Sequence, residues 1–182
     1  MGEIRKSKND VDVNILNLDG DFSELDKANM IELLEEFPQK MRDALRLGEE
    51  FSISDPAFTR NFKNIVVLGM GGSAIGGNLL SDYLADELSI PIVVIRGYNI
   101  PKFVDENSLV FAVSYSGNTE ETLSALKKCL DAKARVIVLT SGGKLAVLAQ
   151  ENNFPVIKVP AGIQPRAAIS YLFFPILKAT ER

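Results

Sequence analysis

From Asn64 onward, short and continuous aliphatic runs alternate along the chain with stretches of helical spacing. The runs predict five strands, at residues 65–68, 92–95, 109–113, 136–139 and 156–159. The stretches between them predict helices near residues 73–86, 119–131 and 143–151. Strands that are apolar along their whole length are typical of a parallel sheet covered on both faces. The pattern therefore predicts an α/β fold, with a doubly wound, five-stranded parallel sheet flanked by helices.

The first third of the chain has a different pattern. Residues 1–27 form a mostly polar N-terminal segment, with a turn expected at Asp19-Gly20. Residues 28–60 are predicted to be a helical segment, because apolar positions recur at helical spacing between residues 28 and 47. Pro38 lacks a backbone N–H and should kink or split this helix.

The end of the chain is unusually apolar. Residues 61–163 contain the predicted sheet, and residues 164–182 are predicted to include a final helix, interrupted by Pro175. The run Ile169–Leu177 could pack on its own sheet or lie at an interface, and we favour the interface, since such a surface should be covered. Residues 164–182 are therefore interpreted as a linker helix towards a missing second domain or a partner.

Composition excludes several classes of function. The net charge of −4 argues against nucleic acid or an anionic membrane as a partner. No apolar run approaches the length of a transmembrane helix, and residues 1–14 do not have the pattern of a signal peptide. The chain has no histidine, so histidine-ligated metal sites and histidine acid–base chemistry are impossible within one copy. We expect neither a metal nor a cofactor.

The single cysteine, Cys129, excludes an internal disulfide and favours a reducing, cytoplasmic setting. It falls on the apolar stripe of the helix predicted at residues 119–131. We therefore expect it to be an inert core residue.

Three hydroxyl side chains follow the third predicted strand. Ser114, Ser116 and Thr119 lie in the turn between that strand and the next helix. The backbone amides of residues 117–120 fall at the helix N-terminus, where free N–H groups and the helix dipole favour an anion. No lysine is present in the turn, so it is not a P-loop. The turn therefore predicts a cradle for a phosphate monoester that is held rather than transferred.

The start of this helix also has the spacing of a capping box. Asn118 would be the N-cap and Glu121 the N3 residue. Glu120 and Glu121 could alternatively supply a catalytic base. We favour the structural interpretation, because acidic residues in the first turn of a helix complement its dipole.

A second glycine-rich loop follows the first predicted strand. The spacing Gly69-x-Gly71-x-x-Ala74 satisfies the dinucleotide-binding fingerprint. That fingerprint also needs an acidic residue after the second strand, where this chain has Arg96. NAD is therefore disfavoured, although an arginine could accommodate the additional phosphate of NADP.

The two loops make better sense as one site. In an open parallel sheet, ligands bind beyond the carboxyl ends of strands where the strand order reverses. Loops after the first and third strands would flank that crevice. Ser73 would then join the three hydroxyls of the other loop around one phosphate, and Gly71 and Gly72 would permit its close approach.

These residues resemble the SIS domain, a sugar isomerase fold that binds phosphosugars. Within that superfamily the chain is most similar to the bifunctional phosphoglucose/phosphomannose isomerases. Three motifs carry the resemblance, in order along residues 28–182: Gly69-Met-Gly-Gly-Ser-Ala74, Ser114-Tyr-Ser-Gly-Asn-Thr-Glu-Glu-Thr122 and Gln164-Pro-Arg-Ala-Ala168.

The resemblance implies an aldose–ketose isomerase that interconverts glucose 6-phosphate or mannose 6-phosphate with fructose 6-phosphate through a cis-enediol(ate). It also implies a homodimer. The phosphate would be bound by Gly71, Gly72, Ser73, Ser114, Ser116 and Thr119. Arg166 would lie near the C1–C2 end of the sugar and stabilise the charge that develops there.

The chain departs from this family in its length. Family members carry two SIS domains, and their catalytic glutamate, ring-opening histidine and a further lysine lie in the part beyond residue 182. The chain thus resembles an N-terminal half that binds the phosphosugar, with little or no turnover alone. Two alternatives remain: a non-catalytic SIS module that senses a sugar phosphate, and an NADP-binding Rossmann oxidoreductase.

Overall fold

The computed structural model describes residues 25–59 and 61–181 of the chain. The turn expected at Asp19-Gly20, and most of the polar segment, lie outside the described residues. The described residues fall into two units, 25–35 and 36–181. The first unit contains α1 (Met30–Glu35), whose first amides are capped by a carboxylate: the N–H groups of Met30 and Ile31 donate to Asp26 at 2.7 and 2.8 Å.

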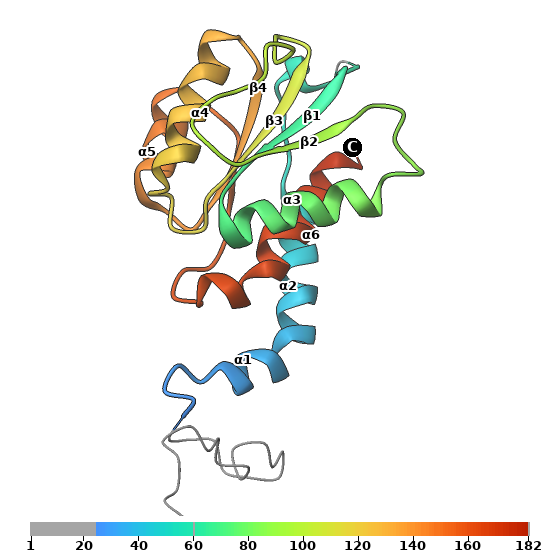
Figure 1. Ribbon diagram of the computed structural model, residues 1–182. Helices are drawn as coiled ribbons and strands as arrows, with labels where there is room; N and C mark the ends of the chain where they lie inside the picture. Colours follow the sequence, from blue (N-terminus) through green and yellow to red (C-terminus); the bar gives the residue numbers. More distant parts are fainter. Residues whose placement is uncertain (1–24, 60, 182) are drawn as a thin grey trace, which may run out of the picture. The chain divides into compact units, whose positions relative to one another are not determined.

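A five-stranded, all-parallel sheet forms the centre of the second unit (Figure 1). Its strands are β1 (Asn64–Leu68), β2 (Ile92–Ile95), β3 (Ser108–Val113), β4 (Arg135–Thr140) and β5 (Val156–Lys158). They are arranged in the order β2-β1-β3-β4-β5, so the chain reverses its direction across the sheet between β1 and β3. The predicted α/β fold with five parallel strands is confirmed.

Helices cover both faces of the sheet. One face is covered by α2 (Phe37–Glu50), α3 (Gly71–Tyr83) and α6 (Ile169–Thr180), and the other by α4 (Glu120–Asp131) and α5 (Gly143–Glu151). Alternate residues of one strand enter opposite cores: Val67 packs on the α3–α6 side and Val66 on the α4–α5 side, both fully buried. This double burial explains why the central strands β1, β3 and β4 are mostly apolar along their length.

Pro38 and Pro175 differ in their effect on the helices in which they lie. The segment predicted as one long helix is assigned as α1 and α2, with Pro38 in the first turn of α2, where its missing N–H costs no hydrogen bond. The prediction that Pro38 splits the helix is confirmed. The prediction that Pro175 interrupts the last helix is wrong, because α6 continues through it. Pro175 is buried there, with its Cα next to Gly48 of α2.

The apolar last helix packs within this unit. Tyr171, Leu172, Ile176 and Leu177 of α6 belong to the core that also contains strand residues of the sheet. The contacts are close at glycines: a Cβ on Gly76 of α3 would lie 2.5 Å from the carbonyl oxygen of Leu172. Packing within the unit thus accounts for most of the apolar character of α6.

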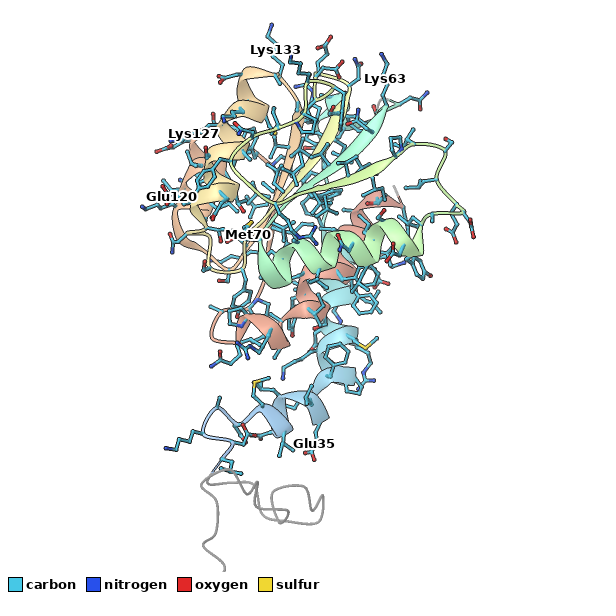
Figure 2. The ribbon with its side chains drawn as sticks, viewed as in Figure 1. Glu35, Lys63, Met70, Glu120, Lys127 and Lys133 are labelled. Atoms are coloured by element: carbon cyan, nitrogen blue, oxygen red, sulfur yellow. The ribbon has the colours of Figure 1, made fainter. Side chains whose placement is uncertain are left out.

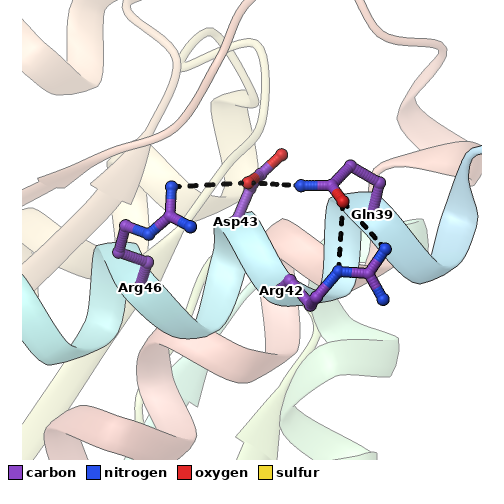
Figure 3. A network of polar contacts seen from close by, with 4 residues as sticks. All are labelled: Gln39, Arg42, Asp43 and Arg46. Atoms are coloured by element: carbon purple, nitrogen blue, oxygen red, sulfur yellow. Dashed lines mark hydrogen bonds and ion pairs between the residues drawn. The ribbon is translucent and has the colours of Figure 1, made fainter.

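The outer face of α2 is polar. Figure 3 shows a network in which Gln39 donates to Asp43 at 3.0 Å, Arg42 donates to Gln39, and Arg46 pairs loosely with Asp43 at 3.8 Å. Surface contacts of this kind contribute little to stability. Within residues 25–59 and 61–181, no helix combines the length and apolarity that a membrane crossing requires.

Cys129 is fully buried on the core side of α4, and its burial raises the pKa of the thiol to about 12. At pH 8, only about one thiol in ten thousand would be the reactive thiolate. We expect native protein to react with a disulfide reagent at least about 100-fold more slowly than protein unfolded in urea. Absorbance-monitored labelling of the single thiol tests this, and equal rates in the two conditions would contradict the buried position.

Candidate phosphosugar-binding site

The predicted site residues lie at one edge of the sheet. The loops after β1 and β3 leave adjacent strands at the point where the strand order reverses, which is where ligands bind in open α/β sheets. In Figure 2, Met70 and Glu120, which mark the starts of α3 and α4, lie towards this edge. Lys63 and Lys133, which precede β1 and β4, lie towards the opposite edge.

The loop after β3 folds around its own hydroxyls. We call residues 114–119 the phosphate loop. The Oγ of Ser114 accepts from the backbone N–H of Gly117 at 3.1 Å and lies 2.9 Å from the Oγ1 of Thr119. Ser114 is 1% exposed, whereas Ser116 is exposed and its Oγ accepts from the N–H of Asn118 at 3.3 Å. These bonds fix the oxygens and leave hydroxyl hydrogens to donate.

Ser73, in the first turn of α3, is brought to the same loop. Its Oγ accepts from the backbone N–H of Tyr115 at 3.3 Å. Among the four predicted hydroxyls, the Ser114–Thr119 contact uses one hydrogen as a donor. The remaining hydroxyl hydrogens have no acceptor within the part of the chain that the structure describes, so they can donate to an anion.

The two glycines of the first loop have different surroundings. Gly71 has φ +50°, and a Cβ there would meet nothing within 4 Å. At Gly72, a Cβ would lie 3.2 Å from the carbonyl oxygen of Pro165. Gly71 thus keeps an open approach to the start of α3, while Gly72 permits a second segment to come close.

The capping box predicted at α4 is wrong. Thr119, not Asn118, is the N-cap residue, and no side chain caps the first amides of the helix. The Asn118 side chain is used elsewhere: its Oδ1 accepts from the N–H of Lys144 at 3.1 Å, and its Nδ2 donates to the carbonyl of Ser116 at 3.2 Å. The first amides of α4 therefore remain available, together with the positive end of the helix dipole.

The loop between β4 and α5 supports the phosphate loop, and sequence reasoning missed it. Ser141 donates to the carbonyl of Tyr115 through its N–H at 3.0 Å and its Oγ at 2.7 Å. The N–H of Leu145 donates to the carbonyl of Gly117 at 2.9 Å. The available signal was composition, since the stretch Thr140-Ser-Gly-Gly143 repeats the hydroxyls and glycines of the other two loops.

The carboxylate of Glu121 interacts with Tyr98 and is not a free base. Glu121, and then Glu120, raise the pKa of Tyr98, which follows β2, and the Tyr98 hydroxyl also hydrogen-bonds to Glu121. The carboxylate of Glu121 is thus directed towards the loop after β2. Both glutamates lie in the first turn of α4, where acidic residues complement the helix dipole, in agreement with the structural interpretation.

Arg166 comes from a third segment of the chain, which precedes α6. It is exposed in the short 3₁₀ helix η3 (Pro165–Ala167), immediately before α6. The carbonyl of Pro165, its neighbour, packs against Gly72 in the first loop. The structure thus brings the Arg166 backbone beside the loop after β1, and brings Ser73 to the phosphate loop, in which Ser114 and Thr119 contact each other.

Comparison with known proteins gives the fold a family. The SIS domain family model matches residues 60–169. The chain is 44% identical over 148 residues to a bifunctional phosphoglucose/phosphomannose isomerase of Caldicellulosiruptor bescii, covering 81% of this chain and 43% of that protein. It is 41% identical over 156 residues to the same enzyme of Thermoplasma acidophilum, covering 86% and 46%.

A solved structure shows the same fold at low sequence identity. The C-terminal domain of glucosamine-fructose-6-phosphate aminotransferase from Francisella tularensis superimposes with a TM-score of 0.66 at 16% identity, over 83% of this chain and 47% of that one. The strand order differs from the 3-2-1-4-5-6 order of Rossmann dinucleotide-binding domains, and gives the nicotinamide alternative no support. The chain belongs to the SIS domain family and is homologous to bifunctional phosphoglucose/phosphomannose isomerases, of which it spans less than half the length.

Proposed function

We propose that this chain is the phosphosugar-binding half of an isomerase that interconverts glucose 6-phosphate or mannose 6-phosphate with fructose 6-phosphate. The observation that carries the proposal is the convergence of Ser73 with the phosphate loop at the strand-order reversal between β1 and β3. Hydroxyl donors and the uncapped first amides of α4 come together there, and a Cβ on Gly71 in the neighbouring loop would meet nothing within 4 Å.

The sugar would extend from this phosphate towards Arg166. A guanidinium at that end can stabilise the negative oxygen that develops when a proton is removed next to a carbonyl. The chemistry also needs a positioned base and a group that assists ring opening. The homologous enzymes are more than twice as long as the matched region, so we assign those groups to a further part of the protein, and expect little or no turnover from residues 1–182 alone.

The exposed side of α3 offers a surface for that further part. Ile75, Leu79 and Tyr83 are exposed apolar side chains at successive helical turns of α3. The Tyr83 ring lies edge-on to Phe173 of α6, with centroids 6.3 Å apart. We assign this face to a second SIS domain, either from a longer chain or from a second copy in a homodimer.

Calorimetric titration with fructose 6-phosphate tests the proposal. We expect saturable binding in the micromolar to millimolar range, because a few charge-assisted hydrogen bonds contribute about 1.5–3 kcal/mol each. Ser116→Ala should weaken binding about tenfold, since it removes one donor without disturbing the buried part of the loop. Ser89→Ala, an exposed serine that precedes β2, is the matched control and should bind like the original chain.

The same titration separates the alternatives. NADPH binding without sugar-phosphate binding would refute the isomerase assignment and favour a dinucleotide site. Robust isomerisation of fructose 6-phosphate by the purified chain would instead refute the assignment of the base to a further part of the protein.

A further inference from the structure

Tyr115 lies inside the phosphate loop but points away from the proposed ligand. Its neighbour Ser116 is exposed, whereas Tyr115 is only 7% exposed and packs in the core between the sheet and α6. A tyrosine hydroxyl that is carried into a core needs hydrogen-bond partners. The partners that this hydroxyl finds belong to the segment that leads to Arg166.

We call residues 160–166 the arginine strap. The Tyr115 hydroxyl donates to the carbonyl of Pro160 at 3.0 Å and accepts from the N–H of Ile163 at 2.8 Å. It thus fills both roles of a hydroxyl with two backbone groups of the strap, three residues apart. Gly162 lies between them with φ +87°, a backbone conformation that favours glycine.

The backbone N–H and carbonyl of Tyr115 form hydrogen bonds to two other loops of the site. Its N–H donates to Ser73, and its carbonyl accepts both bonds from Ser141. The strap has a second fixed point, where the Pro165 carbonyl packs against Gly72. One residue therefore connects both loops of the cradle, the supporting loop before α5 and the strap.

We propose that Tyr115 is a positioning residue that holds Arg166 at a fixed separation from the phosphate, through the two hydrogen bonds of its hydroxyl to the strap. This inference rests on the proposed function and adds to it a means of selecting the ligand. Inorganic phosphate uses the cradle alone, whereas a phosphosugar also uses the strap. The contribution of Tyr115 should therefore appear only with the longer ligand.

The test replaces the hydroxyl and keeps the ring. Tyr115→Phe should bind fructose 6-phosphate about tenfold more weakly, like Arg166→Ala, because a misplaced guanidinium no longer reaches the sugar. Its affinity for inorganic phosphate should stay within about twofold of the original chain. Tyr83→Phe, which removes the hydroxyl of an exposed tyrosine on α3, is the control and should affect neither ligand.

A double-mutant cycle distinguishes positioning of Arg166 from a general loss of order in the binding site. If Tyr115 acts through Arg166, the double variant Tyr115→Phe/Arg166→Ala should bind fructose 6-phosphate no more weakly than Arg166→Ala alone. Additive losses, or an equal loss of inorganic phosphate and fructose 6-phosphate, would overturn the inference. An Arg166→Ala variant that binds fructose 6-phosphate normally would also overturn it.

Hydrogen exchange provides a readout without ligand. The amide of Ile163 should be protected in the original chain and exchange faster in Tyr115→Phe, while amides of the phosphate loop change little. Unchanged exchange at Ile163 would refute the inference. If Tyr115→Phe fails to fold, Gly162→Ala strains the strap outside the cradle and should give the same ligand selectivity.

The outcomes distinguish the two proposals. If the original chain binds inorganic phosphate but not fructose 6-phosphate, the phosphosugar assignment fails and the inference with it. If it binds both and Tyr115→Phe matches it for both, only the inference fails.

Discussion

Replacing Gly117 with alanine should lower the free energy of unfolding by about 3 kcal/mol or more and abolish fructose 6-phosphate binding. Gly117 has φ +69°, and a Cβ there would overlap the carbonyl oxygen of Gly142 in the loop before α5. Backbone strain contributes about 1–3 kcal/mol and overpacking against a fixed carbonyl a similar amount. Either loop must move to relieve the overlap, and both contribute to the site. Urea unfolding and calorimetry measure the two effects.

Gly71→Ala is the matched control for the unfolding measurement. Gly71 also has a positive φ, of +50°, but a Cβ there would meet nothing within 4 Å. Only the backbone cost of about 1 kcal/mol is expected at this position. Equal destabilisation by the two alanines would show that backbone strain alone, and not the contact between the loops, makes glycine necessary at position 117.

Ser114→Ala should weaken fructose 6-phosphate binding about 30- to 100-fold. The Ser114 oxygen accepts from the N–H of Gly117 and pairs with Thr119, so its loss removes a ligand donor and two contacts within the loop, while the Gly117 N–H keeps its bond to the Ser114 carbonyl. The lost hydrogen bond to a charged phosphate costs about 1.5–3 kcal/mol. Together with the lost contacts within the loop, this corresponds to the expected range of affinity.

Thr119→Val measures the contribution of the Thr119 hydroxyl alone. Valine removes the hydroxyl that pairs with Ser114 but leaves the Gly117–Ser114 bond in place, so we expect a loss of about tenfold. Calorimetry of the two variants with the same ligand compares them directly. If Ser114→Ala binds as tightly as the original chain, the phosphate is not held in this loop.

The fold was predictable because its main signal is local. Each strand is short and apolar, and helical spacing separates consecutive strands, so order along the chain alone indicates a parallel sheet. The continuation of α6 through Pro175 was not predictable in this way. It depends on the close approach of α2 at Gly48, a contact between residues more than a hundred positions apart.

The alternation of strands and helices also predicts where the site lies. It does not predict the hydrogen bonds within the site. Loops after the first and third strands were predicted to meet, and the bond between Ser73 and Tyr115 joins them. The capping box failed because Asn118 has a competing partner, the amide of Lys144 in another loop. Sequence spacing describes only neighbours along one helix, so it could not reveal this alternative.

Backbone contacts explain why the supporting loop was missed. The loop before α5 reaches the phosphate loop through the carbonyls of Tyr115 and Gly117, which any residue type could supply. Tyr115 was missed for a related reason. In the sequence it is a single aromatic residue between two serines, and only the folded chain shows that its hydroxyl reaches residues 160 and 163.

The two loops of the cradle, residues 69–73 and 114–119, contain no lysine or arginine. Their donors are hydroxyls and amides, which carry no net charge and do not titrate near neutral pH. Such a cradle retains no counter-ion of its own, and dissolved salt screens fixed, partly buried dipoles only weakly. It would hold a phosphate by the fit of oxygens to donors rather than by opposite charge.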